Sequence, residues 1–449
     1  MAIYCATGSG GSNSNDGRDT LGLALTAGDY DDTGHGDGEH RLYDSGAGFT
    51  AAMDGALLYI ASGTGITAGH YTLTYVSTTV VLLDRSAGSD ATDVATSDGP
   101  WATVEYAVDN TAAATDELRL YGTFTPTAKI TQGDALLGNA GDPARIRGCN
   151  AYGIVDGSLA VVSAASLGAT TDLWEIFPST YGVGHVVVFQ YIDFYGNSGG
   201  RDFLYTAWNP WGVVIFSHCT FRGAGRHILY VSSGANISTC SFEDCEVKDG
   251  ANDVISDSGQ DFATNWLRCS VHDNTGDGIR FCAFDQRGGS ATCEENTVYD
   301  NAGVGIILVE SSPSATSHTG RVILMRHNTV DNNTGNGGEI ATGTDLNGLL
   351  VLESNVFSNN GGYGFDTNGD GSAIALACAN CFPSGSSANT SGDTDAGDVQ
   401  SDGTIAGLTV SYLNFSDEPG FVSTTDGSED YTPDTGSALI GAALTGPTA

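Results

Sequence analysis

Carboxylates are the side chains of this sequence best suited to chemistry. Hydrolysis of a glycosidic bond needs two carboxyl groups, one protonated and one ionised, on either side of the bond. Candidates for such a pair lie between residues 257 and 310, namely Asp257, Asp261, Asp277, Asp285 and Glu310. They form no catalytic motif, so a second interpretation, that they are solvated turn residues, stays open.

Aromatic residues near these carboxylates could bind a sugar. A ring offers a large apolar face, and the polar atoms of Tyr and Trp can add a hydrogen bond. The candidates for carbohydrate binding are Tyr205, Trp208, Trp211 and Trp266.

One segment resembles the first half of a calcium-binding loop. Asp366, Asn368 and Asp370 have the alternating spacing of EF-hand ligands, and Gly371 follows them. Ala377 occupies the position where the bidentate Glu should stand, which favours a polar corner turn over a metal site. A second acidic run, from Asp29 to Asp37, has the same two interpretations. No cofactor other than calcium is indicated.

The net charge limits the partners of this chain. It is −38, from 54 acidic and 16 basic residues. Binding to nucleic acid needs Lys and Arg to displace counterions from phosphates, and an anionic membrane would repel this surface. Nucleic acids and membranes are therefore not expected as partners.

A repeat of about 27 residues organises the chain around these side chains. The repeats align on one apolar position, occupied by Phe194, Phe221, Val247, Val271, Val298, Val330, Phe357 and Phe382. These anchors are 24 to 27 residues apart, except for one interval of 32 residues. The longer interval contains 310–321, which we interpret as a loop inserted into one coil. No amphipathic helix fits inside such a period, so the repeat predicts short strands joined by polar turns.

Further columns support the same alignment. Two residues before the anchors stand Cys219, Cys245, Cys269, Asn296, Asn328, Asn355 and Asn380. Stacking of coils at one strand spacing, about 4.8 Å, would place like residues above one another. Apolar anchors would then form a continuous core, and each Asn could bond its own backbone and the Asn of the next coil. The cysteines are expected to be buried free thiols, because nothing indicates an oxidising compartment.

These columns resemble those of the right-handed parallel β-helix superfamily known as pectin-lyase-like. The resemblance covers about residues 97–440 and implies an all-β solenoid. It does not choose a function, because this fold is used by lyases, hydrolases, adhesins and virus spikes.

The sequence predicts a division into three parts. Residues 1–96 would form a small β-rich domain, arranged as a sheet or a barrel, that docks on a partner. Residues 97–385 would form the β-helix, starting with a cap helix at 98–112 in which Asp98 is the N-cap and Pro100 opens the first turn. Residues 386–449 would form an acidic loop and a closing segment resembling the last turn of such helices.

Three functions agree with these features. The first is a structural virion protein of a tailed phage, such as a tailspike, fibre or capsid appendage, that can bind carbohydrate. It would be a homotrimer attached to other virion proteins through residues 1–96 and assembled in the host cytoplasm, since residues 1–20 do not resemble a signal peptide. The alternatives are a secreted polysaccharide lyase or glycoside hydrolase, which would be extracellular, and a bacterial surface adhesin or filament protein. Cell-surface polysaccharide is an expected ligand of the first.

Overall fold

A computed structural model describes most of the chain. The described residues are 2–19, 21, 23, 25, 28–32, 39–111, 116–132, 136–168, 171–176, 185–196, 202–206, 212–231, 237–250, 255–257, 263–282, 291–309, 322–341, 349–368, 374–383, 388–394, 402–405, 408–411, 419, 421–423, 430–435 and 437. They belong to two compact units. The N-terminal unit comprises Met1–Leu167, Leu173–Thr180 and His185–Tyr195, and the C-terminal unit comprises Gly168–Asp172, Tyr181–Gly184 and Gly196–Ala449.

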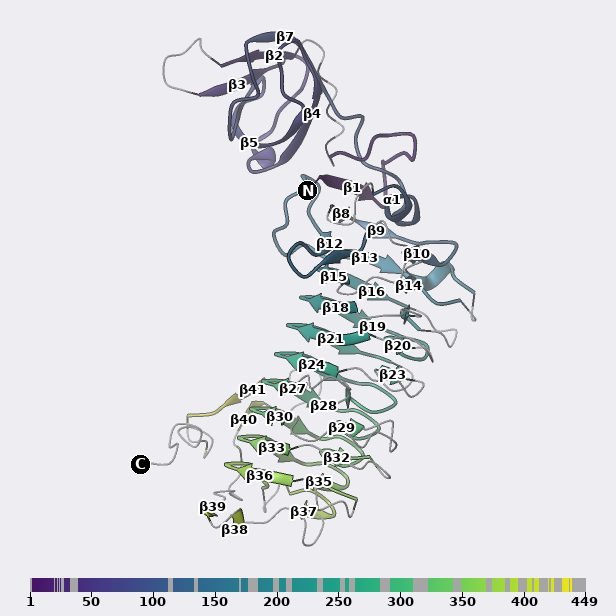
Figure 1. Cartoon of the computed structure of the whole chain (residues 1–449), viewed down its shortest axis with the longest axis vertical. Coiled ribbons are helices and arrows are strands. Elements are labelled where there is room, and N and C mark those ends of the chain that lie inside the picture. Colours follow the sequence, from purple (N-terminus) through teal and green to yellow (C-terminus); the bar gives the residue numbers. More distant parts are fainter. Residues whose placement is uncertain are drawn as a thin grey trace. The chain divides into compact units, whose positions relative to one another are not determined.

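A closed antiparallel barrel occupies much of the N-terminal unit (Figure 1). Its strands are β2 (Gly28–Asp31), β3 (His40–Tyr43), β4 (Leu57–Ser62), β5 (Gly69–Ser77), β6 (Val80–Leu83) and β7 (Ala91–Thr96). Alternate residues of β4 and β5 are buried, as expected for strands with one face on a core. That core includes Tyr30, Leu42, Leu58, Leu73 and Val81. The small β-rich domain predicted from the sequence is therefore a six-stranded barrel.

The first strand of the chain does not belong to this barrel. β1 (Ile3–Thr7) pairs in parallel with β8 (Glu117–Tyr121), which is part of the first coil. The chain leaves for the barrel after Gly17 and returns at Ser97. The two crossings are bonded to each other, since the Gly17 amide donates to the Gly99 carbonyl at 3.1 Å and the Ser97 hydroxyl donates to Asp16 at 2.6 Å. The barrel is thus an insertion between β1 and the rest of the solenoid.

The cap helix is shorter than the sequence predicted. α1 spans Val104–Asn110, and its N-cap is Thr103, whose hydroxyl accepts the Tyr106 amide at 3.2 Å. The expected start at 98 is wrong because Gly99 has a φ of +101° and Trp101 is extended and bonded to β1. The helix buries Val104, Ala107 and Val108.

The first coils complete the N-terminal unit. One sheet continues from β8 to β12 (Ala144–Gly148) and β15 (His185–Gln190), with β11 (Gly138–Asn139) pairing antiparallel to β15. The other strands pair in parallel as β9 (Thr123–Phe124), β13 (Ala160–Ser163) and β16 (Ile192–Tyr195), and as β10 (Ile130–Gln132) with β14 (Trp174–Ile176). Two short 3-10 helices are η1 (Ala51–Met53) and η3 (Ala164–Ser166).

The C-terminal unit consists of coils whose strands pair in parallel with those of the next coil (Figure 1). The first sheet contains β18 (Gly212–Ser217), β21 (Ile237–Glu243), β24 (Ala263–Leu267), β27 (Ala291–Glu294), β30 (Val322–Arg326), β33 (Leu349–Glu353) and β36 (Ile374–Cys378). The second sheet contains β19 (Thr220–Arg222), β22 (Glu246–Lys248), β25 (Ser270–His272), β28 (Thr297–Tyr299), β31 (Thr329–Asp331) and β34 (Val356–Ser358).

Each coil is closed by a third strand. These strands form two groups, β17 (Leu204–Thr206), β20 (Leu229–Val231) and β23 (Ile255–Asp257), then β26 (Ile279–Cys282), β29 (Ile306–Val309), β32 (Gly338–Ile340), β35 (Tyr363–Asp366) and β37 (Gly392–Thr394). Two hairpins follow, β38 (Asp402–Ile405) with β39 (Leu408–Ser411), and β40 (Phe421–Ser423) with β41 (Asp430–Pro433). No helix among the described residues is long and apolar enough to cross a membrane.

The anchor column stacks as the repeat predicted. Val247 pairs with Val271, Val271 with Val298, Val298 with Val330, and Val330 with Phe357. All five side chains are completely buried. The coil alignment is therefore confirmed, while the inserted loop at 310–321 lies outside the described residues.

Buried amides connect the corners of successive coils. Asn296 donates through its side chain to Asn328 at 2.9 Å, and Asn328 donates in the same way to Asn355 at 2.9 Å. A parallel ladder runs from Asn274 to Asn301, Asn333, Asn360 and Asn389. In coils without Asn at the first corner, Cys219, Cys245 and Cys269 take the same position as buried free thiols.

Truncation of the anchor column should create a cavity that the neighbouring coils cannot close. We expect Val298→Ala to lower the free energy of unfolding by about 1–3 kcal/mol. The matched change Thr297→Ala, at the neighbouring outward position of the same strand, should cost no more than about 0.5 kcal/mol. Urea unfolding followed by circular dichroism measures both, and equal costs would contradict the stacking.

Candidate functional site

Of the five predicted carboxylates, only Asp277 has its side chain among the described residues. Asp277 links two coils, because its carboxylate accepts the Val304 amide at 2.8 Å. Asp257 lies on β23, but its side chain is outside the described residues, as are Asp261, Asp285 and Glu310. A catalytic pair among them stays a prediction.

The structure describes two of the four predicted sugar-binding residues, Trp266 and Tyr205. The prediction that Trp266 binds sugar is wrong, because its side chain is completely buried. Its ring stacks on the Phe242 ring with centroids 4.1 Å apart. Alternation along β24 turns this position into the core. Trp208 and Trp211 lie outside the described residues. Tyr205, on β17, is half-buried and remains a candidate.

The described part of the calcium-like segment, Asp366 to Asn368, forms a corner turn. The Asp366 carboxylate accepts the Asn368 amide at 2.8 Å, and Asn368 has the left-handed φ of +51° that such a turn needs. The Asn368 side chain donates to Glu339 at 3.0 Å, while Asp370 is not among the described residues. Across the described part of the chain, no group of three or more His, Cys, Asp or Glu could hold a metal ion.

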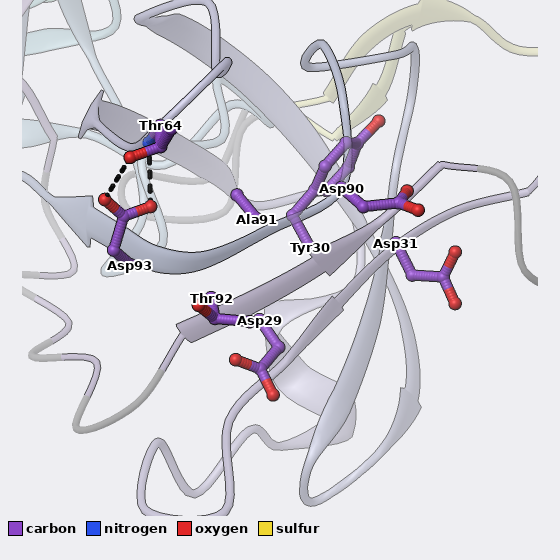
Figure 2. Close-up of a pocket in the computed structure, with 8 residues that line it drawn as sticks. All are labelled: Asp29, Tyr30, Asp31, Thr64, Asp90, Ala91, Thr92 and Asp93. Carbon is purple, nitrogen blue, oxygen red and sulfur yellow. Dashed lines mark hydrogen bonds between the residues drawn. The ribbon is translucent and has the colours of Figure 1, made fainter.

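An acidic pocket opens on the barrel. It encloses about 610 Å³ and is lined by Asp29, Tyr30, Asp31, Thr64, Asp90, Ala91, Thr92 and Asp93. Figure 2 shows that its carboxylates point in different directions and do not converge on one point. The Asp93 carboxylate instead accepts the backbone amide and the hydroxyl of Thr64, both at 2.7 Å. The pocket therefore offers no set of ligands for a cation.

The best candidate site is an aromatic face on the third strands of the C-terminal unit, formed by Tyr205, Tyr230, Arg226 and His227. Tyr205 on β17 pairs with Tyr230 on β20, and their rings stack with centroids 5.7 Å apart and planes at 13°. The Arg226 guanidinium lies over the Tyr230 ring, 4.9 Å from its centroid. His227 stacks beside the same ring at 6.1 Å.

A buried carboxylate fixes the polar half of this aromatic face. Asp202 is completely buried, and its two oxygens accept hydrogen bonds from Arg226 Nε at 3.0 Å and Nη2 at 2.5 Å. The backbone amide of His227 donates to Asp202 at 3.2 Å, and its ring Nδ1 lies 2.9 Å away. Burial alone would raise the pKa of Asp202, but the hydrogen bonds from His227 and Arg226 outweigh it and lower that pKa.

This arrangement can recognise a polar molecule with flat apolar surfaces. A planar guanidinium offers several donors in a fixed fork, and the buried Asp202 accepts from two of them on one edge. The side chains of Arg226 and His227 remain 31% and 13% exposed, so their outer edges can reach a ligand. Because Asp202 neutralises Arg226, the aromatic face offers hydrogen bonds and ring edges rather than net positive charge.

The repeat alignment also predicts that Tyr230 points outward. Residues eight positions after the anchors, including Leu229, form an inward column. The next residue of a strand must point outward, so the outward residues were readable from the alignment. The bonds of Arg226 and His227 to Asp202 span 24 and 25 residues, a coil-to-coil contact that no local motif reveals.

A comparison with known protein families supports the β-helix fold of the coils. Residues 203–380 match the family described as the right handed beta helix region. No curated protein matches the chain. Similar solved structures include pectate lyase Pel9A, with 14% identity, a TM-score of 0.42 and coverage of 75% of this chain and 83% of that one.

Two further structures are similar over comparable lengths. The periplasmic alginate epimerase AlgG, as a double mutant, has 12% identity, a TM-score of 0.36 and coverage of 68% of this chain and 77% of that one. ORF18 of Geobacillus virus E2 has 13% identity, a TM-score of 0.31 and coverage of 66% and 55%. These likenesses transfer no activity or substrate to this chain.

Neutralising Asp202 should lower the stability of the protein, and the loss should depend on pH. We expect Asp202→Asn to lower the free energy of unfolding by about 2–3 kcal/mol at pH 7, because a charged hydrogen-bond acceptor of Arg226 is lost. The folded pKa of Asp202 is lowered, so its stabilisation is present above the unfolded pKa of about 3.9 and fades as the pH falls through the folded value. Urea titrations at pH 7 and pH 3 test this, and a difference that does not shrink in acid would contradict the ion pair.

Proposed function

We propose that this chain, a right-handed parallel β-helix, binds a neutral polysaccharide through its aromatic face. The observation that carries the proposal is the stacked pair Tyr205 and Tyr230 beside a guanidinium that a buried carboxylate holds in place. Sugar rings combine apolar C–H groups with hydroxyl groups. The outer edges of the two stacked rings can contact the C–H groups, and Arg226 and His227 can form hydrogen bonds with the hydroxyl groups.

The repeat of the solenoid suits a chain-like ligand. Tyr205 and Tyr230 come from neighbouring coils and their centroids are 5.7 Å apart. A polysaccharide lying along the coil axis would therefore meet one ring from each coil. Contacts between aromatic rings and sugars tolerate variation in the sugar units of the polysaccharide. They still give affinity, because many small contacts add along the polymer.

The charge of the chain favours a neutral glycan. With a net charge of −38, it would repel a polyanion at low ionic strength. Locally, Arg226 is paired with Asp202, so no free positive charge is left to attract a uronate or a sulfate group through that pair.

Binding rather than cleavage is the activity that this face supports. Its carboxylate, Asp202, is completely buried and ion-paired with Arg226. A general acid needs a raised pKa, whereas the pKa of Asp202 is lowered. A lyase or glycoside hydrolase would have to use other carboxylates, such as the predicted Asp257 to Glu310 set.

Removing one ring of the stack should weaken glycan binding. We expect Tyr230→Ala to reduce affinity for neutral glucans at least tenfold, since it deletes a contact surface and the support of the guanidinium. Tyr363→Ala, on β35, serves as the matched control and should bind like the unaltered protein. Isothermal titration against a panel of neutral and acidic oligosaccharides measures both. An unaltered protein that binds only acidic glycans, or none, would contradict the proposal.

A second candidate is a virion appendage that carries such a binding face. The observation that favours it is the barrel, which has its own core and is inserted between β1 and α1 with its two crossings bonded. The solenoid does not need this module to close its first coil, so a docking role on other virion proteins, in trimers, would explain its presence.

Excising the barrel tests this docking role. We expect replacement of residues 20–96 by a short Gly-Ser linker to leave the coils folded, because β1 and the crossings at Asp16 and Ser97 are kept. The excised protein should lose trimerisation and particle attachment. Circular dichroism checks that the coils remain folded, and analytical ultracentrifugation checks the loss of trimerisation. A full-length chain that is already monomeric would argue against the appendage.

A further inference from the structure

An outward column crosses the second sheet of the C-terminal unit. Its members pair in register from Arg222 on β19 to Ser358 on β34, through Lys248, His272, Tyr299 and Asp331. The His272 and Tyr299 rings stack with centroids 4.7 Å apart and planes at 7°. Outward positions of a β-helix normally face solvent, yet Asp331 is only 1% exposed.

The C-terminal hairpin of β40 and β41 contacts this column. The Tyr431 ring lies 5.1 Å from the Tyr299 ring and 5.2 Å from that of Phe421 on the paired strand. The Tyr431 hydroxyl donates to Asp331 at 3.3 Å. Tyr431, on β41, therefore contacts Tyr299 on β28 and Asp331 on β31.

We propose that the hairpin of β40 and β41 is a reversible strap, seated by Tyr431 on the outward column and released as the pH rises. The proposal is independent of the carbohydrate-binding function. Its geometric basis is that one aromatic side chain covers a carboxyl group that lies on a solvent-facing position of the sheet.

The charge state of Asp331 determines how strongly the hairpin is held against the second sheet. Burial raises the pKa of Asp331, although Ser358, Asn359 and Tyr431 all donate hydrogen bonds to it. The carboxylate of Asp300, on the preceding coil, raises that pKa further. Among the described groups, those with the largest effect on this pKa include no cation, so the ionised form is poorly compensated when Tyr431 covers it.

The direction of the pH effect follows from linkage. The covered carboxyl has a raised pKa, so seating of the strap takes up protons and is strongest below the ordinary carboxyl pKa of about 3.9. It weakens as the pH rises through the raised value. His272, whose ring stacks on Tyr299, also has a raised pKa, because hydrogen bonds to Glu246 and Asp273 outweigh its burial.

Hydroxyl-radical footprinting of the full chain, read by mass spectrometry, tests the strap. We expect oxidation of Tyr431 to become at least threefold faster between pH 4.5 and pH 8, relative to Tyr363 on the far strand β35 of the same chain. Asp331→Asn should keep Tyr431 protected at both pH values, because an amide still accepts its hydroxyl but cannot ionise. Asp300→Asn keeps Asp331 and should retain the pH dependence with its midpoint at lower pH, because a charge that raises the pKa of Asp331 is removed.

Three results would overturn the proposal. The first is equal protection of Tyr431 at both pH values in the unaltered protein. The second is the same pH dependence in Asp331→Asn. The third is a reactive Tyr431 at pH 4.5 in Asp331→Asn whose circular dichroism matches that of the unaltered protein, since the strap would then depend on something other than this carboxyl.

Discussion

The structure depends on one constraint: each coil must offer its backbone and its side chains to an almost identical coil one strand spacing away. Parallel pairing satisfies the backbone, and it also places equivalent positions in contact. A residue suited to one coil is therefore suited to the next, as the run from Val247 to Phe357 shows. Polar residues obey the same rule only when they can donate and accept at once. Asn can do both, which is why Asn296, Asn328 and Asn355 can remain buried.

The same constraint explains where function can reside. Inward columns are committed to packing, and corner columns are committed to amide ladders and left-handed turns. Only outward positions are free to vary, and there the structure places Tyr205 and Tyr230 on one face and His272, Tyr299 and Asp331 on another. Because outward residues also stack, a binding face on this scaffold is extended along the coils rather than enclosed in a pocket.

The repeat allowed the fold to be predicted from the sequence, and the site only in part. Periodic residues such as Val271 report contacts between coils directly, since each contact recurs at the same spacing. Asp202 and Tyr431 do not recur, and their partners lie 24 and 100 residues away, so spacing carries no information about them. The prediction for Trp266 was wrong because it relied on the residue type, which suggested sugar binding at the surface. The position of Trp266 in β24 places it in the core. The cap helix was placed too early because Asp98 and Pro100 imitate a helix start, while pairing of Trp101 with β1 holds that segment extended.

The amide ladders have a mechanical consequence. A molecule whose coils are pulled apart along the coil axis would yield one coil at a time, since each ladder Asn bonds groups of its own coil and of the adjacent coils. The chain would peel away in steps of one coil, and a coil of about 27 residues would release about 90 Å of extended chain. Force would be dissipated in many similar, separately reversible steps, as in a tether that yields gradually without breaking.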